Sequence, residues 1–186
     1  LTRAAFPDLA LPASLTLGVA LLMTRPPLTA GTMRSTYRAL AYLIAAGVAL
    51  QAASVALGFF TIIHEVEDGG VITAGYDYDS NLGIILHRIG GLGIIPLSAI
   101  ALLVVSFFTK VPGAVRRAAA VFGLVLLQIA LVFVAFMTTS GGALHGLNAL
   151  AVFGAAIWAG WRVSHPTVVD HGEMAAFEDQ TTATSP

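Results

Sequence analysis

The chain of 186 residues contains no cysteine and few charged side chains. The absence of cysteine excludes disulfides, thiolate metal sites, iron–sulfur clusters and thiol catalysis. Charged residues make up 10% of the chain and hydrophobic residues 57%, whereas ordinary globular domains are roughly 45–50% apolar. Nine basic and ten acidic side chains are too few to cover the surface of a water-soluble fold of this size. We therefore expect the lipid bilayer to be the main solvent and partner of the chain.

A strong charge of one sign is also absent. The formal net charge is −1, which gives the chain no overall basic field, so a nucleic acid is not an expected partner. The side chains that remain as metal ligands are those of His, Asp, Glu and Met.

Four apolar segments are each long enough to cross a bilayer, which takes about 20 helical residues. They cover residues 39–63, 82–108, 115–137 and 143–161. Polar breaks at residues 65–80, 110–113 and 138–142 separate them, and short connections favour antiparallel neighbours. The sequence therefore predicts an all-α fold in which residues 33–164 form an integral membrane bundle of four helices in up-down order.

Basic residues near the span ends fall on one side of this arrangement: Arg34, Arg38, Lys110, Arg116, Arg117 and Arg162. The stretch 65–80 has no Lys or Arg and carries five acidic residues. Because Lys and Arg concentrate on the cytoplasmic side of membrane proteins, we expect a multi-pass protein of the bacterial inner membrane with both termini in the cytoplasm.

The two ends of the chain differ from the spans. The apolar run at residues 9–23 is interrupted by Pro12 and is short for a span, which is typical of a signal-like or re-entrant segment. Alternatively, residues 1–32 are an upstream extension of a protein that begins at Met33, directly before Arg34 and the first span. Residues 165–186 are polar and are expected to form a solvated cytoplasmic tail.

Polar side chains repeat at matching places in the two halves of the predicted bundle. Gln51 and Gln128 lie in the middle of the first and third spans, and His87 and His145 lie within the first two turns of the second and fourth. Polar side chains inside a membrane usually face the interior of the bundle. Because the second and fourth spans run in the same direction, we expect the two imidazoles at similar depth near the outer surface.

The spacing expected between these two spans suits a haem. With neighbouring axes about 8–10 Å apart, the second and fourth helices are diagonal partners roughly 11–14 Å apart. A bare metal ion is too small to fill that gap with two imidazoles, whereas a haem between the helices accepts one histidine on each face of its iron. The sequence therefore predicts haem b as cofactor, with His87 and His145 as its ligands.

Residues around the histidines suit such a pocket. Gly90 and Gly91, three and four residues after His87, leave room for a flat macrocycle. Arg88 is the only basic residue expected on the outer side, and a guanidinium suits a haem propionate. Three further polar residues are expected to line the pocket: Gln51, Gln128 and Asn148.

Purely structural interpretations remain open for each of these residues. A histidine near a helix end is commonly an interfacial residue or an interhelical hydrogen bonder. Arg88 can instead reach the outer interface or pair with an acid of residues 65–80, and the polar amides can simply hydrogen bond across helices. A second cluster, at the outer end of the first span, suggests either a zinc or hard-metal site or a solvated acidic loop: His64, Glu65, Glu67 and Asp68.

Several short motifs are similar to those of a known family. They are Tyr37-Arg38-Ala39-Leu40-Ala41 with residues 47–51, Leu86-His87-Arg88-Ile89-Gly90, Leu127-Gln128, and Leu144-His145-Gly146-Leu147-Asn148-Ala149-Leu150 continuing to Trp161-Arg162. With these motifs, residues 33 to about 163 resemble the bacterial family of small four-helix membrane proteins called domain of unknown function 6220. The resemblance implies a four-helix membrane fold and no particular activity.

A more distant resemblance bears on the cofactor. The His87-Arg88 opening of the second span, paired with His145, is similar to one four-helix half of heme A synthase, whose halves hold haem between such histidines. That family places a glutamate just ahead of the histidine, where this chain has residues 83–86 without an acid. The resemblance therefore implies haem binding but not haem hydroxylation.

The sequence thus favours a small b-type membrane cytochrome that binds one haem near the outer leaflet and transfers electrons, with quinol or a respiratory membrane complex as partner. Two histidine ligands leave no open position on the iron, so we expect an electron carrier rather than an enzyme on its own. The alternative is a non-catalytic accessory subunit of a larger respiratory complex. A transporter ranks last, because Pro96 is the only proline well inside a span and broken helices mark such proteins.

Overall fold

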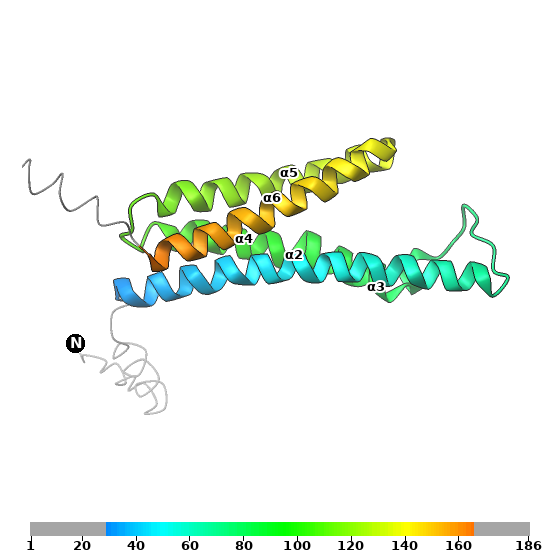
Figure 1. The fold of residues 1–186 in the computed structure, drawn as a ribbon, viewed down its shortest axis with the longest axis horizontal. Coiled ribbons are helices and arrows are strands. Elements are labelled where there is room, and N and C mark those ends of the chain that lie inside the picture. Colours follow the sequence, from blue (N-terminus) through cyan, green and yellow to red (C-terminus); the bar gives the residue numbers. More distant parts are fainter. Residues whose placement is uncertain (1–28, 166–186) are drawn as a thin grey trace, which may run out of the picture.

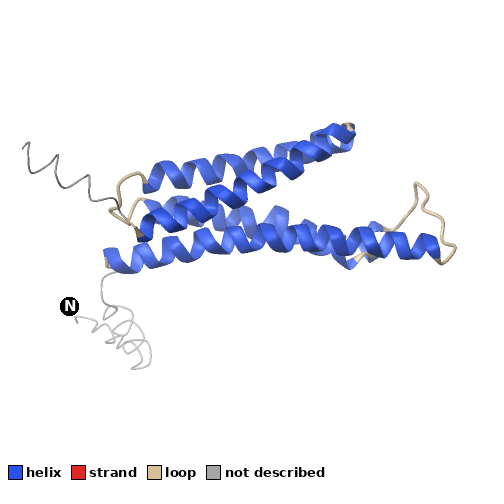
Figure 2. Cartoon of the chain, viewed as in Figure 1, coloured by secondary structure: helices blue, strands red, loops and turns tan. Residues whose placement is uncertain are grey.

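The computed structural model describes residues 29–165, and all regular structure within them is helical (Figures 1 and 2). In chain order the elements are α2 (Ala30–Glu67), the 3₁₀ helix η1 (Tyr78–Ser80), α3 (Leu82–Ile89), the π-helical segment η2 (Gly90–Ile94), α4 (Ile95–Ser106), α5 (Ala114–Met137) and α6 (Thr139–Ser164). Because α3, η2 and α4 follow one another directly, they form one rod. The prediction of an all-helical chain is confirmed for the described residues, and four helical segments are long and apolar enough to span a membrane.

The expectations for the two ends of the chain lie mostly outside the described residues. Of the segment 1–32, only residues 29–32 are described, and α2 already begins at Ala30. The side chain of Thr29 accepts a hydrogen bond from the backbone amide of Thr32 at 3.2 Å, which caps the helix. Of the predicted tail 165–186, only His165 is described.

The helix α2 is longer than the apolar run that predicted it. It spans 38 residues and continues past Ile63 to Glu67, so the prediction that the break begins at residue 65 was wrong. Glutamate is a good helix former, and its solvated side chain does not oppose another helical turn. The helix ends just before Gly69, which has a φ of +92°, a conformation that glycine adopts at little cost.

The prediction of a five-residue break at residues 138–142 was also wrong. Only Thr138 separates α5 from α6, and its side chain accepts a hydrogen bond from the amide of Gly141 at 3.1 Å. Gly141 lies close against the end of α5. A Cβ at this position would stand 2.5 Å from the backbone carbonyl of Val134, so a side chain would obstruct the turn. A threonine cap and a close-packed glycine therefore replace the expected loop.

The second span contains an irregularity that its hydropathy does not reveal. At η2 the amide of Ile95 bonds to the carbonyl of Gly90, one residue farther back than in an α-helix. Pro96 follows within the first turn of α4, and because it has no amide to donate to the preceding turn, it suits the irregular hydrogen bonding of η2. The π-helical segment begins at Gly90, three residues after His87.

Helix packing brings the first span against the second and fourth. The helix α2 packs on α3, α4 and α6, while α5 packs on α4 and α6. Figure 1 shows α5 alongside α6 and α2 alongside α3, with the two pairs diverging toward the α2–α3 connection. Neighbours in sequence are thus also neighbours in space.

The buried apolar core occupies one half of the molecule. Its members come from the first half of α2, from α4, from the first half of α5 and from the second half of α6. Many are alanines, which allow helices to approach closely. The opposite half, where α2 meets α3 and α5 turns into α6, instead buries glycines and polar side chains: Ser54, Gly58, Asn81, Gly83, Gly90, Gly141 and Asn148.

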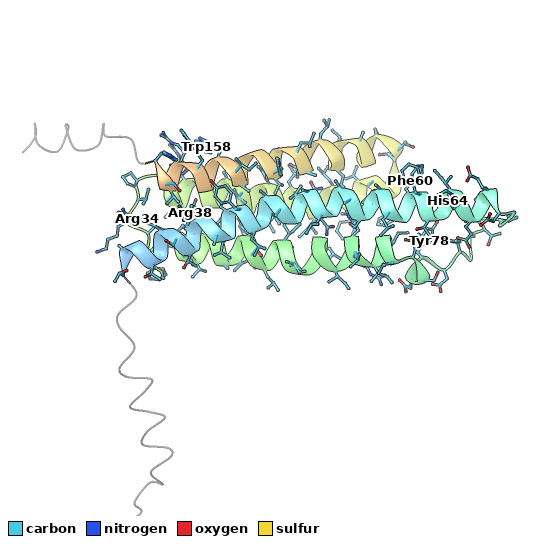
Figure 3. The ribbon with its side chains drawn as sticks, turned by 60° about the horizontal axis from the view of Figure 1, so that its bottom comes forward. Arg34, Arg38, Phe60, His64, Tyr78 and Trp158 are labelled. Carbon is cyan, nitrogen blue, oxygen red and sulfur yellow. The ribbon has the colours of Figure 1, made fainter. Side chains whose placement is uncertain are left out.

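Charge is segregated between the two ends. Figure 3 shows Arg34 and Arg38 at one end and His64 and Tyr78 at the other. The α4–α5 turn lies at the arginine end, because Arg34 Nε donates to the carbonyl of Thr109 at 3.2 Å. Among the described residues, all the acids lie in residues 65–79, at the opposite end.

Candidate functional site

The two histidines predicted as ligands lie close together in the structure. His87 comes from α3 and His145 from α6, and the centroids of their rings are 6.3 Å apart with the ring planes at 68°. Both residues are half-buried. Two imidazole nitrogens bound on opposite sides of one metal atom at about 2 Å each, plus about 1.2 Å from each nitrogen to its ring centre, give a centroid spacing of about 6–6.5 Å. The centroid spacing equals that of two imidazoles on one metal atom, but in this structure both ring nitrogens of His145 lie against Gln128.

The side of the site that belongs to α5 and α6 is a closed network of hydrogen bonds. The Gln128 side-chain amide donates to the carbonyl of His145 at 2.9 Å and lies 3.1 Å from His145 Nε2. His145 Nδ1 lies 3.2 Å from the carbonyl of Gln128. A carbonyl only accepts, so His145 carries its proton on Nδ1, and the lone pair of Nε2 accepts from the Gln128 amide.

Asn148, one turn after His145, completes this network. Its side-chain amide donates to the carbonyl of Leu124 at 2.9 Å and to Gln128 Oε1 at 2.6 Å. Gln128 is therefore held from two sides, and it in turn holds the imidazole of His145. In metal sites a histidine ligand usually donates its second ring nitrogen to such a fixed acceptor.

The side of the site that belongs to α2 and α3 leaves polar atoms without a partner. The amide of Gln51 reaches the carbonyl of Leu86 only at 3.5 Å. Within the described chain, Gln51 Oε1 and His87 Nδ1 are buried and make no hydrogen bond. A buried polar atom without a partner costs about 1–3 kcal/mol, which makes these two atoms candidates for contacts with a bound group.

Gly90 and Gly91 make room for Gln51. A Cβ at Gly90 would stand 2.0 Å from Gln51 Nε2, and one at Gly91 would stand 3.3 Å from Gln51 Oε1. This space was predicted to hold a macrocycle. In the structure, the amide end of the flexible Gln51 side chain occupies this space.

Arg88 does not join the ring pair. It donates from Nη1 to Asp79 Oδ1 at 2.6 Å, and both side chains are more than half exposed. This pairing with the acidic connection is the alternative that the sequence left open. An exposed ion pair of this kind is worth about 0–1 kcal/mol, so Arg88 can exchange Asp79 for another anion at small cost.

Sequence reasoning missed the residues that fix α3 in place. Asn81 is buried and caps α3, accepting from the amide of Ile84 at 3.2 Å, while its own amide donates to the carbonyl of Gly58 at 2.9 Å. Gly83 lies against the backbone of α2 at the same level. An asparagine directly before an apolar run is a helix-start signal that identifies this cap from sequence.

The second cluster, at the end of α2, is dispersed. His64 Nδ1 lies 3.2 Å from Glu67 Oε2, but Glu65 instead accepts from the Tyr76 hydroxyl at 2.8 Å. Over residues 29–165 no three His, Asp or Glu side chains are grouped in a way that could hold a metal ion. This arrangement agrees with the solvated acidic loop rather than with a metal site.

Comparisons with protein-family models, with curated proteins and with solved structures find no match to this chain. The site is therefore interpreted from its own residues.

Proposed function

We propose that this chain is a small membrane protein of the cytochrome b type, which binds one haem b between α3 and α6 and serves electron transfer near the outer leaflet. The observation that carries the proposal is the 6.3 Å spacing of the His87 and His145 rings, in the half of the molecule whose interior is polar. The unpartnered Nδ1 of His87 adds to it.

The proposal includes insertion in the bacterial inner membrane in up-down order, with both termini cytoplasmic. Four apolar helical segments of sufficient length support insertion. The separation of basic residues from acidic residues supports the orientation, because Lys and Arg favour the cytoplasmic side. The acidic α2–α3 connection and the site near it then face the outer side.

Binding of an iron porphyrin would require a rearrangement around His145. The Gln128 carbonyl accepts the Nδ1 proton of His145, and the Gln128 side-chain amide donates to the lone pair of Nε2. Movement of the Gln128 amide away from Nε2 frees this lone pair, and the bond from Gln128 to the His145 carbonyl can persist. A haem held by two imidazoles supplies one-electron redox chemistry. Quinol or a respiratory membrane complex is the proposed partner.

A specific observation favours a second candidate, a non-catalytic accessory subunit of a larger membrane complex. Both ring nitrogens of His145 are engaged by Gln128 within the protein, as expected of an interhelical hydrogen bonder. In this case the His87 and His145 rings would pack on each other and the protein would be colourless.

A difference spectrum with matched histidine variants separates the two candidates. Protein is purified in detergent from haem-replete cells, and reduced-minus-oxidised absorbance is recorded for the unmodified chain, His87→Ala, His145→Ala and His64→Ala. The last is the control, since His64 is exposed and lies outside the site. We expect sharp b-type bands that both site variants lose and the control keeps. A colourless protein, or bands unchanged in His87→Ala, would refute the proposal.

A further inference from the structure

The arginine end of the molecule holds a turn that is clamped by side chains from two helices. Arg34 Nε donates to the carbonyl of Thr109, and the Tyr37 hydroxyl donates to the carbonyl of Ala114, both at 3.2 Å. From α5, Arg117 Nη2 donates to the carbonyl of Pro112 at 3.0 Å. The α4–α5 turn is therefore held rigidly beside the first turns of α2.

The turn holds a lysine in a conformation that favours glycine. Lys110 has a φ of +53°, and it is the only non-glycine residue with positive φ among those described. The left-handed conformation costs roughly 1–2 kcal/mol for a residue with a Cβ. Glycine or asparagine suits such a position better, so a contribution from the ammonium group of Lys110 would offset this cost.

Within residues 29–165, the basic groups around this turn have no acidic partner. Arg34 uses only Nε in its bond to Thr109, and its two terminal nitrogens make no hydrogen bond to any described residue. Neither of the two ion pairs found within residues 29–165 lies at this end. Five basic side chains here are exposed or half-buried: Arg34, Arg38, Lys110, Arg116 and Arg162.

Aromatic residues mark the same end as an interfacial zone. Phe107 and Phe108, just before the turn, are 63% and 58% exposed, and Trp158 and Trp161 are each 48% exposed. Trp158 also lies under Arg117, whose guanidinium carbon is 5.8 Å from the ring centre. Exposed aromatic rings of this kind sit at the headgroup level of a bilayer.

We propose that Arg34 and Lys110 bind the phosphate of an anionic phospholipid from the cytoplasmic leaflet. Arg34 offers two terminal N–H groups for the phosphate oxygens, and Lys110 directly follows Thr109, whose carbonyl Arg34 contacts. Phe107 and Phe108, which precede the turn, offer exposed apolar surface to acyl chains, which favours a lipid over a free phosphate ion. Basic pockets between helices on this side of a membrane are suited to such headgroups. The proposal rests on membrane insertion and not on haem.

Native mass spectrometry of the full chain in an uncharged detergent, titrated with phosphatidylglycerol, tests this site. The variant combines Arg34→Gln with Lys110→Asn, and asparagine tolerates the positive φ. The control combines Arg116→Gln with Arg162→Gln, which removes the same charge from the same end. We expect about twentyfold weaker binding of the first lipid in the variant and about threefold or less in the control.

Circular dichroism and elution volume establish that both double variants fold, and phosphatidylcholine serves as the zwitterionic probe. Equal losses in the two double variants, or no loss in either, would contradict a discrete site. Inorganic phosphate at the lipid concentration is expected not to compete, and its displacement of the lipid would contradict the lipid assignment. Phosphatidylcholine that binds as tightly as phosphatidylglycerol would likewise contradict the proposal.

Discussion

Replacement of Gly83 by alanine tests how α3 is placed against α2. A Cβ at Gly83 would stand 2.2 Å from the backbone nitrogen of Gly58 and 2.5 Å from the backbone oxygen of Ser54. Both atoms belong to the interior of α2 and cannot rotate away as a side chain would. The two helices can accommodate the methyl group only by moving apart.

The cost of this movement follows from the contact distances. Ordinary contacts begin at 3.4 Å, so α3 must retreat from α2 by about 1 Å at this level. Overpacking of this kind costs about 1–3 kcal/mol, and the better helix propensity of alanine returns up to about 1 kcal/mol. We therefore expect Gly83→Ala to lower the free energy of unfolding by about 1–2 kcal/mol and to displace His87, one turn farther along α3.

Unfolding by SDS in mixed micelles measures the change, with Gly123→Ala as the control. No atom lies within 4 Å of a Cβ at Gly123, so the control is expected to be unchanged or stabilised by up to about 1 kcal/mol. If Gly83→Ala were as stable as the control, the close approach of the α2 and α3 backbones would be refuted.

Three further outcomes are expected. Asn148→Ala removes two hydrogen bonds to α5 and should cost about 1–2 kcal/mol in the same SDS assay, and no loss would contradict the network. The hydrogen bond to Glu65 raises the pKa of Tyr76, so this contact stabilises the fold below the ordinary tyrosine pKa and fades as pH rises through the higher folded value. Titration of phenolate absorbance should show a lower Tyr76 pKa in Glu65→Gln, and an unchanged value would contradict the contact. Because the chain lacks cysteine, Ala74→Cys and Ser35→Cys report orientation directly: an impermeant maleimide added to intact cells should label only the first, and the reverse pattern would contradict the proposed topology.

Hydropathy was sufficient to predict the helical segments but not where they end. The apolar runs predicted four spans, and four helical segments of spanning character are present. Helix ends depend instead on local capping and on close backbone contacts. Thr138 with Gly141 shortens the last connection to one residue, and acidic residues extend α2 beyond its apolar run.

The candidate site was predictable in its residues and less so in their contacts. His145, Gln128 and Asn148 were expected to lie in one pocket, and the structure joins His145 and Asn148 to Gln128. The partners of Gln51 and Arg88 depend on the π-helical segment η2 and on the fold of an acidic loop, neither of which has a hydrophobic period. These contacts therefore could not be read from the pattern of apolar residues.

The haem content of the purified chain tests the central claim most directly. Protein from haem-replete cells is denatured in alkaline pyridine, and the reduced-minus-oxidised spectrum is compared with the protein concentration from amino-acid analysis. The account predicts b-type haem at about one per chain, as two histidine ligands from a single chain require. A purified, folded protein with no measurable haem would contradict it and leave His87 and His145 as packing partners.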